Sequence, residues 1–440
     1  MTPHEADNPD EADELHEPET IRIVRAELSR LIEPGDLLAG VMLDVLGPES
    51  LHALITSGRA VSRSERDRFA EIAESSGLGP KQQDLNAGLT RWRTRSGQLH
   101  GCQDIASMQR LGGGLLIPED SGWPEQLNDL GPQAPVALWY RAGAPGRTES
   151  GPSALDRLPS LSRSVAMVGS REITDYGIRV TAELTQELVR AGLCVISGGA
   201  YGVDAAVHRA ALRAAEMNEV HRAHGPTLAV LAGGLDRYYP AGNERLLQDV
   251  AKEGLLLSEM APGSAPTRHR FLQRNRLIAA LAMVTVVTEA RWRSGAQSTA
   301  HHALALGRPV GVVPGSIYSA SSSGCHRLLK ETPAELVTDA AEILVLAGGL
   351  TLDILASPPS RTRETAKQPV LPVPYPASNP VDGLTQAQRL LFDALPKRGL
   401  SSPGKLSSVA GLPIPTVLAE LTRLQRIGRA RMVNGQWGQA

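Results

Sequence analysis

Aromatic side chains and cysteines are scarce in this sequence. Phenylalanine, tryptophan and tyrosine make up only 3% of the 440 residues, so the core must be built from Leu, Val, Ile and Ala. The three cysteines, Cys102, Cys194 and Cys325, lie far apart without CxxC spacing, which argues against a disulfide framework or a zinc site. No apolar run reaches the length of a membrane span, and the start of the chain is acidic and polar rather than signal-like. We therefore expect a cytoplasmic protein that makes no membrane contact.

Common nucleotide-binding and catalytic signatures are also missing. No GxGxxG follows a predicted strand and no GxxxxGKS or GxxxxGKT occurs, so neither a dinucleotide dehydrogenase nor a P-loop nucleotidase is supported. Asp204 and His208 lie four residues apart on one predicted helix face, where a stabilising pair is more common than an acid–base pair or half a metal site. Glu289 ends a predicted strand without a nucleophile to pair with, and we expect it to orient arginine or backbone N–H groups. We predict no catalytic set, no metal site and no cofactor.

Acidic residues are concentrated at the start of the chain. Residues 1–20 contain eight Asp or Glu and no Lys or Arg, which leaves 45 basic against 39 acidic residues in the remainder. Such a composition predicts a disordered acidic tail. The tail could compete with nucleic acid for a basic surface, although a solvated tail is the simpler interpretation.

The next segment, residues 21–110, has the pattern of a small helical domain. Apolar residues recur at helical spacing, and the breaks fall at Pro34-Gly35, Gly47-Pro48 and Ser57-Gly58. Short helices with glycine-bearing turns are typical of bundles of the sterile-alpha-motif or helix-hairpin-helix kind. Some of these bundles grip DNA phosphates and others only pack or bind protein, and the sequence does not separate the two uses.

Residues 111–347 alternate between predicted strands and helices. Most of the strands are continuously aliphatic or β-branched, which is typical of strands buried on both faces of a parallel sheet. This pattern predicts an α/β domain with a doubly wound sheet and extra strands at its front. The predicted strands are 115–117, 136–140, 165–168, 194–197, 228–232, 255–258, 285–288 and 310–313.

The C-terminal part begins with a proline-rich stretch. Residues 348–380 are predicted to be a linker, because 357–380 contain seven prolines in 24 positions and cannot form a helix or a central strand. Residues 381–440 then show three helical patterns and a basic hairpin with Asn434-Gly435 as its turn. Helix, helix-turn-helix and β-wing is the order of a winged helix, a fold that usually binds DNA but also binds protein.

Glycine turns follow two neighbouring strands of the predicted sheet. Gly169-Ser170-Arg171 follows the strand at 165–168, and SGGAYGVD at 197–204 follows the strand at 194–197. In an open parallel sheet this edge is where ligands bind. Glycine lets backbone N–H groups approach an anion, and the neighbouring arginine favours a phosphate.

Two further segments reach the same predicted edge. Arg268–Arg276, RHRFLQRNR, is rich in basic residues and is placed just ahead of a helix beginning near Leu277. Glu289–Thr299, EARWRSGAQST, follows the strand at 285–288 and contains a predicted helix start at Ser294-Gly295. Each segment is a weak signal alone. Together they predict a basic cleft that suits a string of phosphates better than a single small ligand.

Five ordered motifs in this sequence resemble the hallmark segments of the DprA/Smf family of DNA-processing proteins. They are GSR, SGGAYGVDAAVHRAAL, FLQRNRLIAALA, TEARWRSGAQSTAHHALALGRPVGVVPGS and SGCHRLL. The resemblance implies an extended Rossmann-like domain that dimerises, binds single-stranded DNA without sequence preference and loads the recombinase RecA onto it. It implies no enzymatic turnover and no cofactor.

The matching motifs also give the candidate DNA-binding residues. Phe271, the one aromatic residue beside the basic cluster, is equally compatible with stacking on a base and with packing in the core. The predicted DNA-binding residues are Gly169, Ser170, Arg171, Gly198, Gly199, Phe271, Arg274, Asn275, Arg276, Ser294, Gly295 and Thr299.

Two alternative functions are weighed against this one. A nucleotide-cleaving phosphoribohydrolase on a related scaffold would carry a Pro-Gly-Gly-x-Gly-Thr loop, whereas Pro314-Gly315 is followed here by Ser-Ile. A regulator of double-stranded DNA would act through the winged helix, with the α/β domain as its sensor. The order of the motifs favours the single-strand function.

Overall fold

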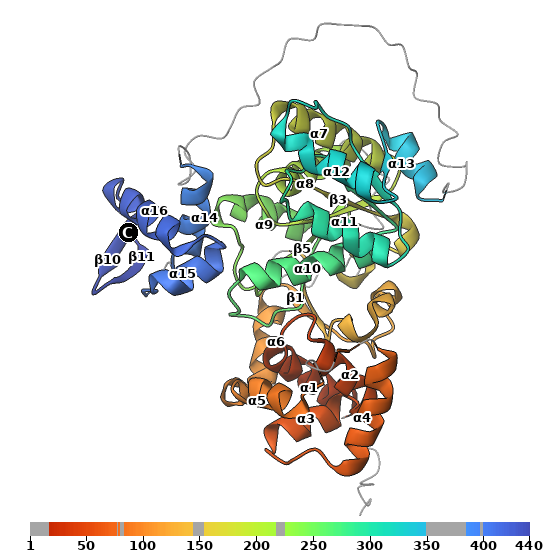
Figure 1. The fold of residues 1–440 in the computed structure, drawn as a ribbon, viewed down its shortest axis with the longest axis vertical. Coiled ribbons are helices and arrows are strands. Elements are labelled where there is room, and N and C mark those ends of the chain that lie inside the picture. The colour runs from red at the N-terminus through yellow and green to blue at the C-terminus, as the bar shows by residue number, and fades with distance from the viewer. Residues whose placement is uncertain are drawn as a thin grey trace, which may run out of the picture.

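The computed structural model describes residues 17–76, 78–79, 83–143, 154–216, 225–348, 384–396 and 399–440. Most of the predicted acidic tail, and all of the proline-rich stretch at 357–380, lie outside these residues. The described helices and strands gather into three parts, each with its own cluster of buried apolar residues (Figure 1).

A nine-stranded sheet forms the centre of the molecule, in the order β1-β2-β6-β5-β4-β3-β7-β8-β9. From β6 to β9 in this spatial order, every pair of neighbouring strands is parallel, whereas β2 is antiparallel to both β1 and β6. This confirms the predicted α/β class with a mostly parallel sheet. The strands are β1 (Gly113–Leu116), β2 (Leu138–Arg141), β3 (Ser164–Val168), β4 (Cys194–Gly198), β5 (Thr227–Val230), β6 (Leu255–Ser258), β7 (Val284–Val287), β8 (Val310–Val312) and β9 (Glu335–Leu336).

Helices cover both faces of this sheet, because successive side chains of each buried strand point to opposite sides. In β3, Ala166 and Val168 pack with α10, α11 and α12, while Val165 and Met167 pack with α7, α8 and α13. The flanking helices are α7 (Asp175–Arg190), α8 (Val203–Glu216), α9 (Glu244–Glu253), α10 (Arg268–Leu281), α11 (Ala296–Ala305), α12 (Ser323–Glu331) and α13 (Ala340–Leu346).

Strand positions agree with the sequence to within about two residues, but two features differ. The short strand β9 was not predicted, since Glu335 and Leu336 are exposed and carry no alternating pattern. Helix α10 begins at Arg268 rather than near Leu277, because Thr267 caps it by accepting a hydrogen bond from the backbone N–H of Arg270. The basic segment is therefore helical along its whole length.

The N-terminal part consists of six helices at one end of the sheet domain (Figure 1). No single helix of the described ranges has the length and apolar composition to cross a membrane; α2 and α3 pass that test only as a pair, and they are bent by 114°. The helices are α1 (Glu17–Leu31), α2 (Leu37–Leu46), α3 (Pro48–Thr56), α4 (Arg63–Ser75), α5 (Leu85–Arg93) and α6 (Gly101–Arg110).

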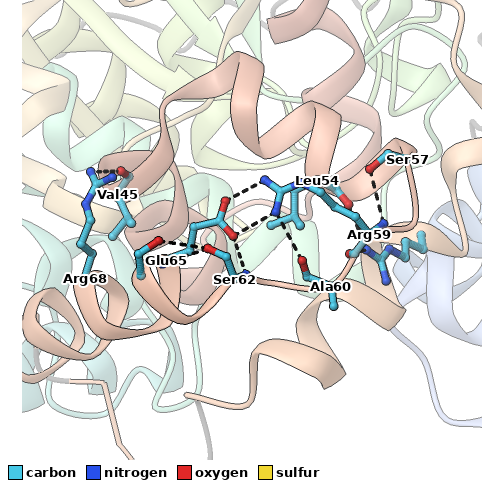
Figure 2. Close-up of polar contacts among 10 residues, drawn as sticks. Val45, Leu54, Ser57, Arg59, Ala60, Ser62, Glu65 and Arg68 are labelled. Atoms are coloured by element: carbon cyan, nitrogen blue, oxygen red, sulfur yellow. Dashed lines mark hydrogen bonds and ion pairs between the residues drawn. The ribbon is translucent and has the colours of Figure 1, made fainter.

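The start of α4 shows how local sequence sets a helix boundary (Figure 2). The Ser62 hydroxyl accepts a hydrogen bond from the backbone N–H of Glu65, and the Glu65 carboxylate accepts one from the backbone N–H of Ser62. Arg59 donates two hydrogen bonds to the same carboxylate. These contacts, with that of Arg59 the largest, lower the pKa of Glu65 to about 2.

The C-terminal part has three helices and a two-stranded sheet, which lie beside α9 and α10 (Figure 1). Its turn at Asn434-Gly435 has positive φ at both residues, as the Asn-Gly sequence predicts. The elements are α14 (Gln386–Ala394), α15 (Pro403–Ala410), α16 (Ile414–Arg426), β10 (Ala430–Val433) and β11 (Gln436–Gln439).

Helix α10 is joined to its surroundings by two ion pairs. Near its start, Arg270 pairs with Glu33 of the N-terminal part at 2.8 Å. Further along, the fully buried guanidinium of Arg276 pairs with Glu259 at 2.5 Å and donates to the carbonyl of Gln133 at 2.9 Å. A buried pair of this kind is sensitive to the loss of one partner, because the remaining charge is left without compensation.

We therefore expect Glu259→Ala to lower the free energy of unfolding by about 3–5 kcal/mol, since it leaves the Arg276 guanidinium buried and unpaired. Urea unfolding followed by circular dichroism measures this loss. Glu331→Ala is the matched control, because it breaks the exposed Arg327–Glu331 pair and such pairs are worth at most about 1 kcal/mol. Equal stability of the two variants would contradict this account of Arg276.

Candidate nucleic-acid interface

The connections of the sheet open a cleft at the carboxyl end of β3. From β3 the chain continues through β4, β5 and β6 on one side, and then crosses to β7 and β8 on the other. The loops after β3 and β7 therefore diverge, and in open α/β sheets ligands bind at such a switch point. The predicted glycine turns lie at this point.

A cavity of about 470 Å³, which we call the switch-point cleft, opens here. Its walls come from the loop after β3, from α10, and from the start of α11. Nine of the twelve predicted DNA-binding residues line it: Gly169, Ser170, Arg171, Phe271, Arg274, Asn275, Ser294, Gly295 and Thr299.

Arg274 is the most buried charge of the cleft. Its side chain is only 6% exposed, and Nη1 donates a hydrogen bond to the carbonyl of Val230 at the end of β5. Burial lowers its pKa to about 10, which leaves the guanidinium charged at neutral pH. Its Nε atom has no hydrogen-bond partner among the described residues. The nearby Asp204 carboxylate offsets part of this desolvation cost, and an anion in the cleft would offset more.

Gly198 makes room for this arginine. A Cβ at that position would collide with Nη1 of Arg274 and with Oδ2 of Asp204, so any other residue at the end of β4 would force these two side chains to move. Asp204 in turn accepts a hydrogen bond from the backbone N–H of Ala200 at 3.2 Å. Gly198 therefore does not line the switch-point cleft but supports its floor.

An arginine and two aromatic rings form a second wall. The guanidinium carbon of Arg171 lies 4.9 Å from the centre of the Phe271 ring, in cation–π geometry. The Tyr239 ring is tilted against Phe271, with 6.0 Å between centroids. Phe271 is half-buried and lines the cleft rather than belonging to the apolar core. Its ring edge and the adjacent guanidinium offer a surface for an unstacked base beside a phosphate.

The start of α11 closes the opposite side. Gly295 precedes the first turn, and Ala296, Ser298 and Thr299 of that turn line the cleft. Asn275 of α10 donates to the carbonyl of Gly295 at 3.3 Å and so ties the two helices together. The N-terminal end of a helix adds a partial positive charge that favours an anion.

Three arginines at the rim were not among the predicted residues. Arg268, Arg291 and Arg293 line the cleft, which brings its arginines to five against the acidic Glu172 and Asp204. Arg291 pairs with Glu172 at 2.6 Å, and both side chains are substantially exposed. Their positions in the two basic segments could have indicated them. Arg291 and Arg293 lie between the end of β7 and the start of α11, and Arg268 lies in the first turn of α10.

Two predicted residues are directed elsewhere. Gly199 lines a neighbouring cavity, and Arg276 faces Glu259 on the far side of α10. The expectation for Arg276 was wrong in its geometry because it placed this segment ahead of a helix. Residues two positions apart on an α-helix are separated by about 200° around its axis, so Arg274 and Arg276 cannot both face the cleft.

The titratable groups near the cleft have structural partners. Glu289 accepts hydrogen bonds from the backbone N–H and the hydroxyl of Thr174, at 2.9 and 2.6 Å, and so holds the start of α7. His208 is buried between the Thr227 hydroxyl and the Gly198 carbonyl, at 2.7 Å from each, and burial lowers its pKa. The described ranges contain no group of three His, Cys, Asp or Glu side chains that could hold a metal ion.

The C-terminal part lies directly over this edge of the sheet. The carboxylate of Asp393 in α14 accepts hydrogen bonds from the Tyr201 hydroxyl and, at 3.0 Å, from the backbone N–H of Ala241. Burial and the nearby Asp393 carboxylate raise the pKa of Tyr201 above its usual value. Five residues of this part also line the switch-point cleft: Gln386, Leu390, Val409, Ala410 and Gly411.

Comparisons with known proteins give a consistent result. A family model described as DNA recombination-mediator protein A matches residues 114–348. The putative DNA processing protein DprA of Mycobacterium tuberculosis is 39% identical over 344 residues, which cover 76% of this chain and 79% of that protein. The DNA processing protein DprA of Streptococcus pneumoniae is 37% identical over 225 residues, covering 51% of this chain and 71% of the relative. An X-ray structure of the Streptococcus pneumoniae protein superposes with a TM-score of 0.52 at 29% identity, covering 73% of this chain and 97% of that one.

The contact between Gly198 and Arg274 leads to a stability prediction. Gly198→Ala forces a methyl group into the space of the guanidinium, and overpacking of this kind costs about 1–3 kcal/mol of unfolding free energy. Gly295→Ala is the matched control, because a Cβ there meets no atom within 4 Å. Urea unfolding of the two variants should separate them by at least about 1 kcal/mol. Indistinguishable unfolding curves would show that the guanidinium relaxes without penalty.

Proposed function

We propose that this chain, which belongs to the DNA recombination-mediator protein A (DprA/Smf) family, binds single-stranded DNA without sequence preference in the switch-point cleft. The proposal rests on one observation, which is that two arginines of that cleft have no carboxylate at ion-pair distance among the described residues. These two, Arg171 and Arg274, both lie at the edge of the sheet where ligands bind.

The chemistry of the cleft favours a strand's backbone over its bases. Guanidinium groups, a helix N-terminus and glycine turns all address phosphate oxygens, which are the same for every sequence. Aromatic side chains are few, so stacking on Phe271 is a minor contribution beside the charges. This balance supports binding that is sensitive to salt and indifferent to base composition.

The proposal also covers the protein's partners, its oligomeric state, its location and its lack of catalysis. We propose that the protein delivers RecA to the bound strand, in keeping with the words "recombination-mediator" in the family's description. We also propose that it acts as a homodimer in the cytoplasm and catalyses no turnover. The exposed edge strand β9, where Leu336 is 51% exposed, offers an apolar surface for self-association.

The N- and C-terminal parts have supporting places in this proposal. We assign the N-terminal helices to a small sterile-alpha-motif or helix-hairpin-helix bundle and residues 381–440 to a winged helix. The exposed Arg429 and Arg431 beside the hairpin favour a second candidate function, in which the C-terminal part binds duplex DNA.

The test is to remove single arginines of the cleft. Arg171→Ala and Arg274→Gln should each weaken binding of a 20-nucleotide single strand by about 1.5–3 kcal/mol, the range of a lost charge-assisted contact. Each should also reduce the slope of log K against log salt by about 0.7, because one phosphate fewer is neutralised. Fluorescence anisotropy over a salt series, with poly-dT and mixed-sequence strands, measures both quantities.

Arg190→Ala is the control for net charge, because Arg190 is exposed in the last turn of α7, at the opposite edge of the sheet. It should leave affinity and salt slope unchanged. The proposal fails if the cleft variants stay folded and bind like the wild type, or if binding falls for one base type only. Stronger competition by duplex DNA than by single strands would favour the second candidate function, and hydrolysis of free nucleotides would favour an enzyme.

A further inference from the structure

A second and larger cavity adjoins the switch-point cleft. It measures about 750 Å³ and opens at the carboxyl ends of β5 and β6, between the sheet domain and the C-terminal part. We call it the Arg141 cavity, after a residue in its wall that no feature of the proposed site uses. Its size lies within the range of pockets that enclose a small organic ligand.

Arg141, the last residue of β2, is buried to 6% exposure. Its Nη1 atom donates to the carbonyl of Leu235 at 3.0 Å, and its guanidinium carbon lies 4.5 Å from the centre of the Tyr238 ring. Its Nε atom has no hydrogen-bond partner among the described residues. Burial lowers the pKa of Arg141, so the charge is held against a desolvation cost.

A comparison with other buried arginines of the molecule shows what is unusual here. Arg276 pairs with Glu259 at 2.5 Å, and Arg308 pairs with Asp129 at 2.9 Å. Arg141 and Arg274 are as deeply buried, but no ion pair joins either of them to a carboxylate within the described ranges. These are the two that line the Arg141 cavity. A desolvated guanidinium without a carboxylate is suited to an anion that arrives from outside.

Three carboxylates also lie in the cavity wall, and two of them are held by donors of their own. Asp236 accepts a hydrogen bond from the backbone N–H of Gly263 at 2.6 Å and also pairs with Arg237. Asp393 is held by Tyr201 and Ala241, as described above. The third, Glu244, begins α9. Asp236 favours the charged form of Arg141 through space, but no ion pair at hydrogen-bond distance joins Arg141 to a carboxylate within the described ranges.

The two cavities share one wall. Tyr239, Phe271, Arg274 and Val409 line both of them. The two cavities are therefore neighbours, with Arg274 in the wall between them. The aromatic rings of Tyr238 and Tyr239 accompany the two arginines on the cavity side.

We propose that the Arg141 cavity is a second subsite for the same strand, which takes one further nucleotide with its phosphate on Arg141. This inference rests on the proposed single-strand function and extends it by defining where the strand leaves the first cleft. The recognised chemistry is a nucleotide phosphate beside an aromatic surface. The bound strand is its source, because the shared wall places the two cavities next to each other.

The experiment measures affinity against strand length. Wild-type protein is titrated with oligo-dT from 3 to 20 nucleotides, alongside Arg141→Gln, Ala265→Trp, Arg171→Ala and the control Arg190→Ala. Ala265 is an exposed residue of the cavity wall, so tryptophan there would narrow the cavity without removing a buried charge. Circular dichroism establishes that each variant is folded.

The cavity variants should match the wild type on the shortest strands. They should bind the longest strands roughly tenfold more weakly, as expected for one lost charge-assisted contact. Arg171→Ala should instead weaken binding at every length. If Ala265→Trp follows the wild type at every length, the second subsite is overturned, whatever Arg141→Gln does. In that case, if Arg171→Ala still weakens binding, the proposed single-strand function stands. If Arg171→Ala also has no effect, both the second subsite and the proposed function are overturned.

Titration with thymidine monophosphate tests whether the cavity binds part of a long strand or a free nucleotide. If it binds wild-type protein saturably, and Arg141→Gln abolishes this binding while the length series stays unchanged, the cavity is a mononucleotide site and the strand subsite is overturned. If thymidine monophosphate competes only with the long strands, the strand subsite is supported.

Discussion

The spacing of side chains around α10 is the constraint on which the rest of the structure depends. With about 100° between successive residues, Arg270 and Arg274 share one face of the helix a turn apart, where they reach Glu33 of the N-terminal part and the cleft, while Arg276 is turned away toward Glu259. The apolar residues that follow, from Leu277 to Leu281, hold the same helix against the sheet. A single short segment therefore sets the position of the charge proposed to bind DNA, the attachment of a neighbouring part and part of the core.

Buried arginines of this molecule differ in how their charges are compensated, and the difference sets this edge of the sheet apart. Buried arginines that serve the fold carry a carboxylate at hydrogen-bond distance, as Arg276 and Arg308 do. Arg274 instead rests on a backbone carbonyl above a glycine, which is a weaker form of compensation. The nearby Asp204 carboxylate compensates this charge in part, without forming an ion pair, and under the proposed function a polyanion would supply a closer partner. The same logic makes Gly198 a structural requirement of the site, although it touches no ligand space.

Much of this arrangement could be predicted from the sequence, and the rest depends on tertiary contacts. Buried parallel strands are continuous apolar runs, and the turns after them are rich in glycine, so β3, β4 and β7 and the cleft between them follow from local patterns. The start of α10 was predicted too late, because the basic residues mask its amphipathic pattern and the single capping residue Thr267 is a weak local signal. That error assigned Arg276 to the cleft. The wall contributed by Arg141 was beyond prediction, since β2 joins β6 from a distant part of the chain.

The position of the C-terminal part has a consequence for the speed of binding rather than its strength. Residues of α14 and α15 line both cavities, and Asp393 holds this part against the loops after β4 and β5. Under the proposed function, the C-terminal part would cover a strand lying in both cavities, so a strand with a free end would slide in while a closed circular strand would need the C-terminal part to move aside. Linear and circular molecules of the same sequence would then differ in association rate while sharing one equilibrium contact set. The protein would then distinguish linear from circular DNA by its rate of binding, although no side chain recognises the difference directly.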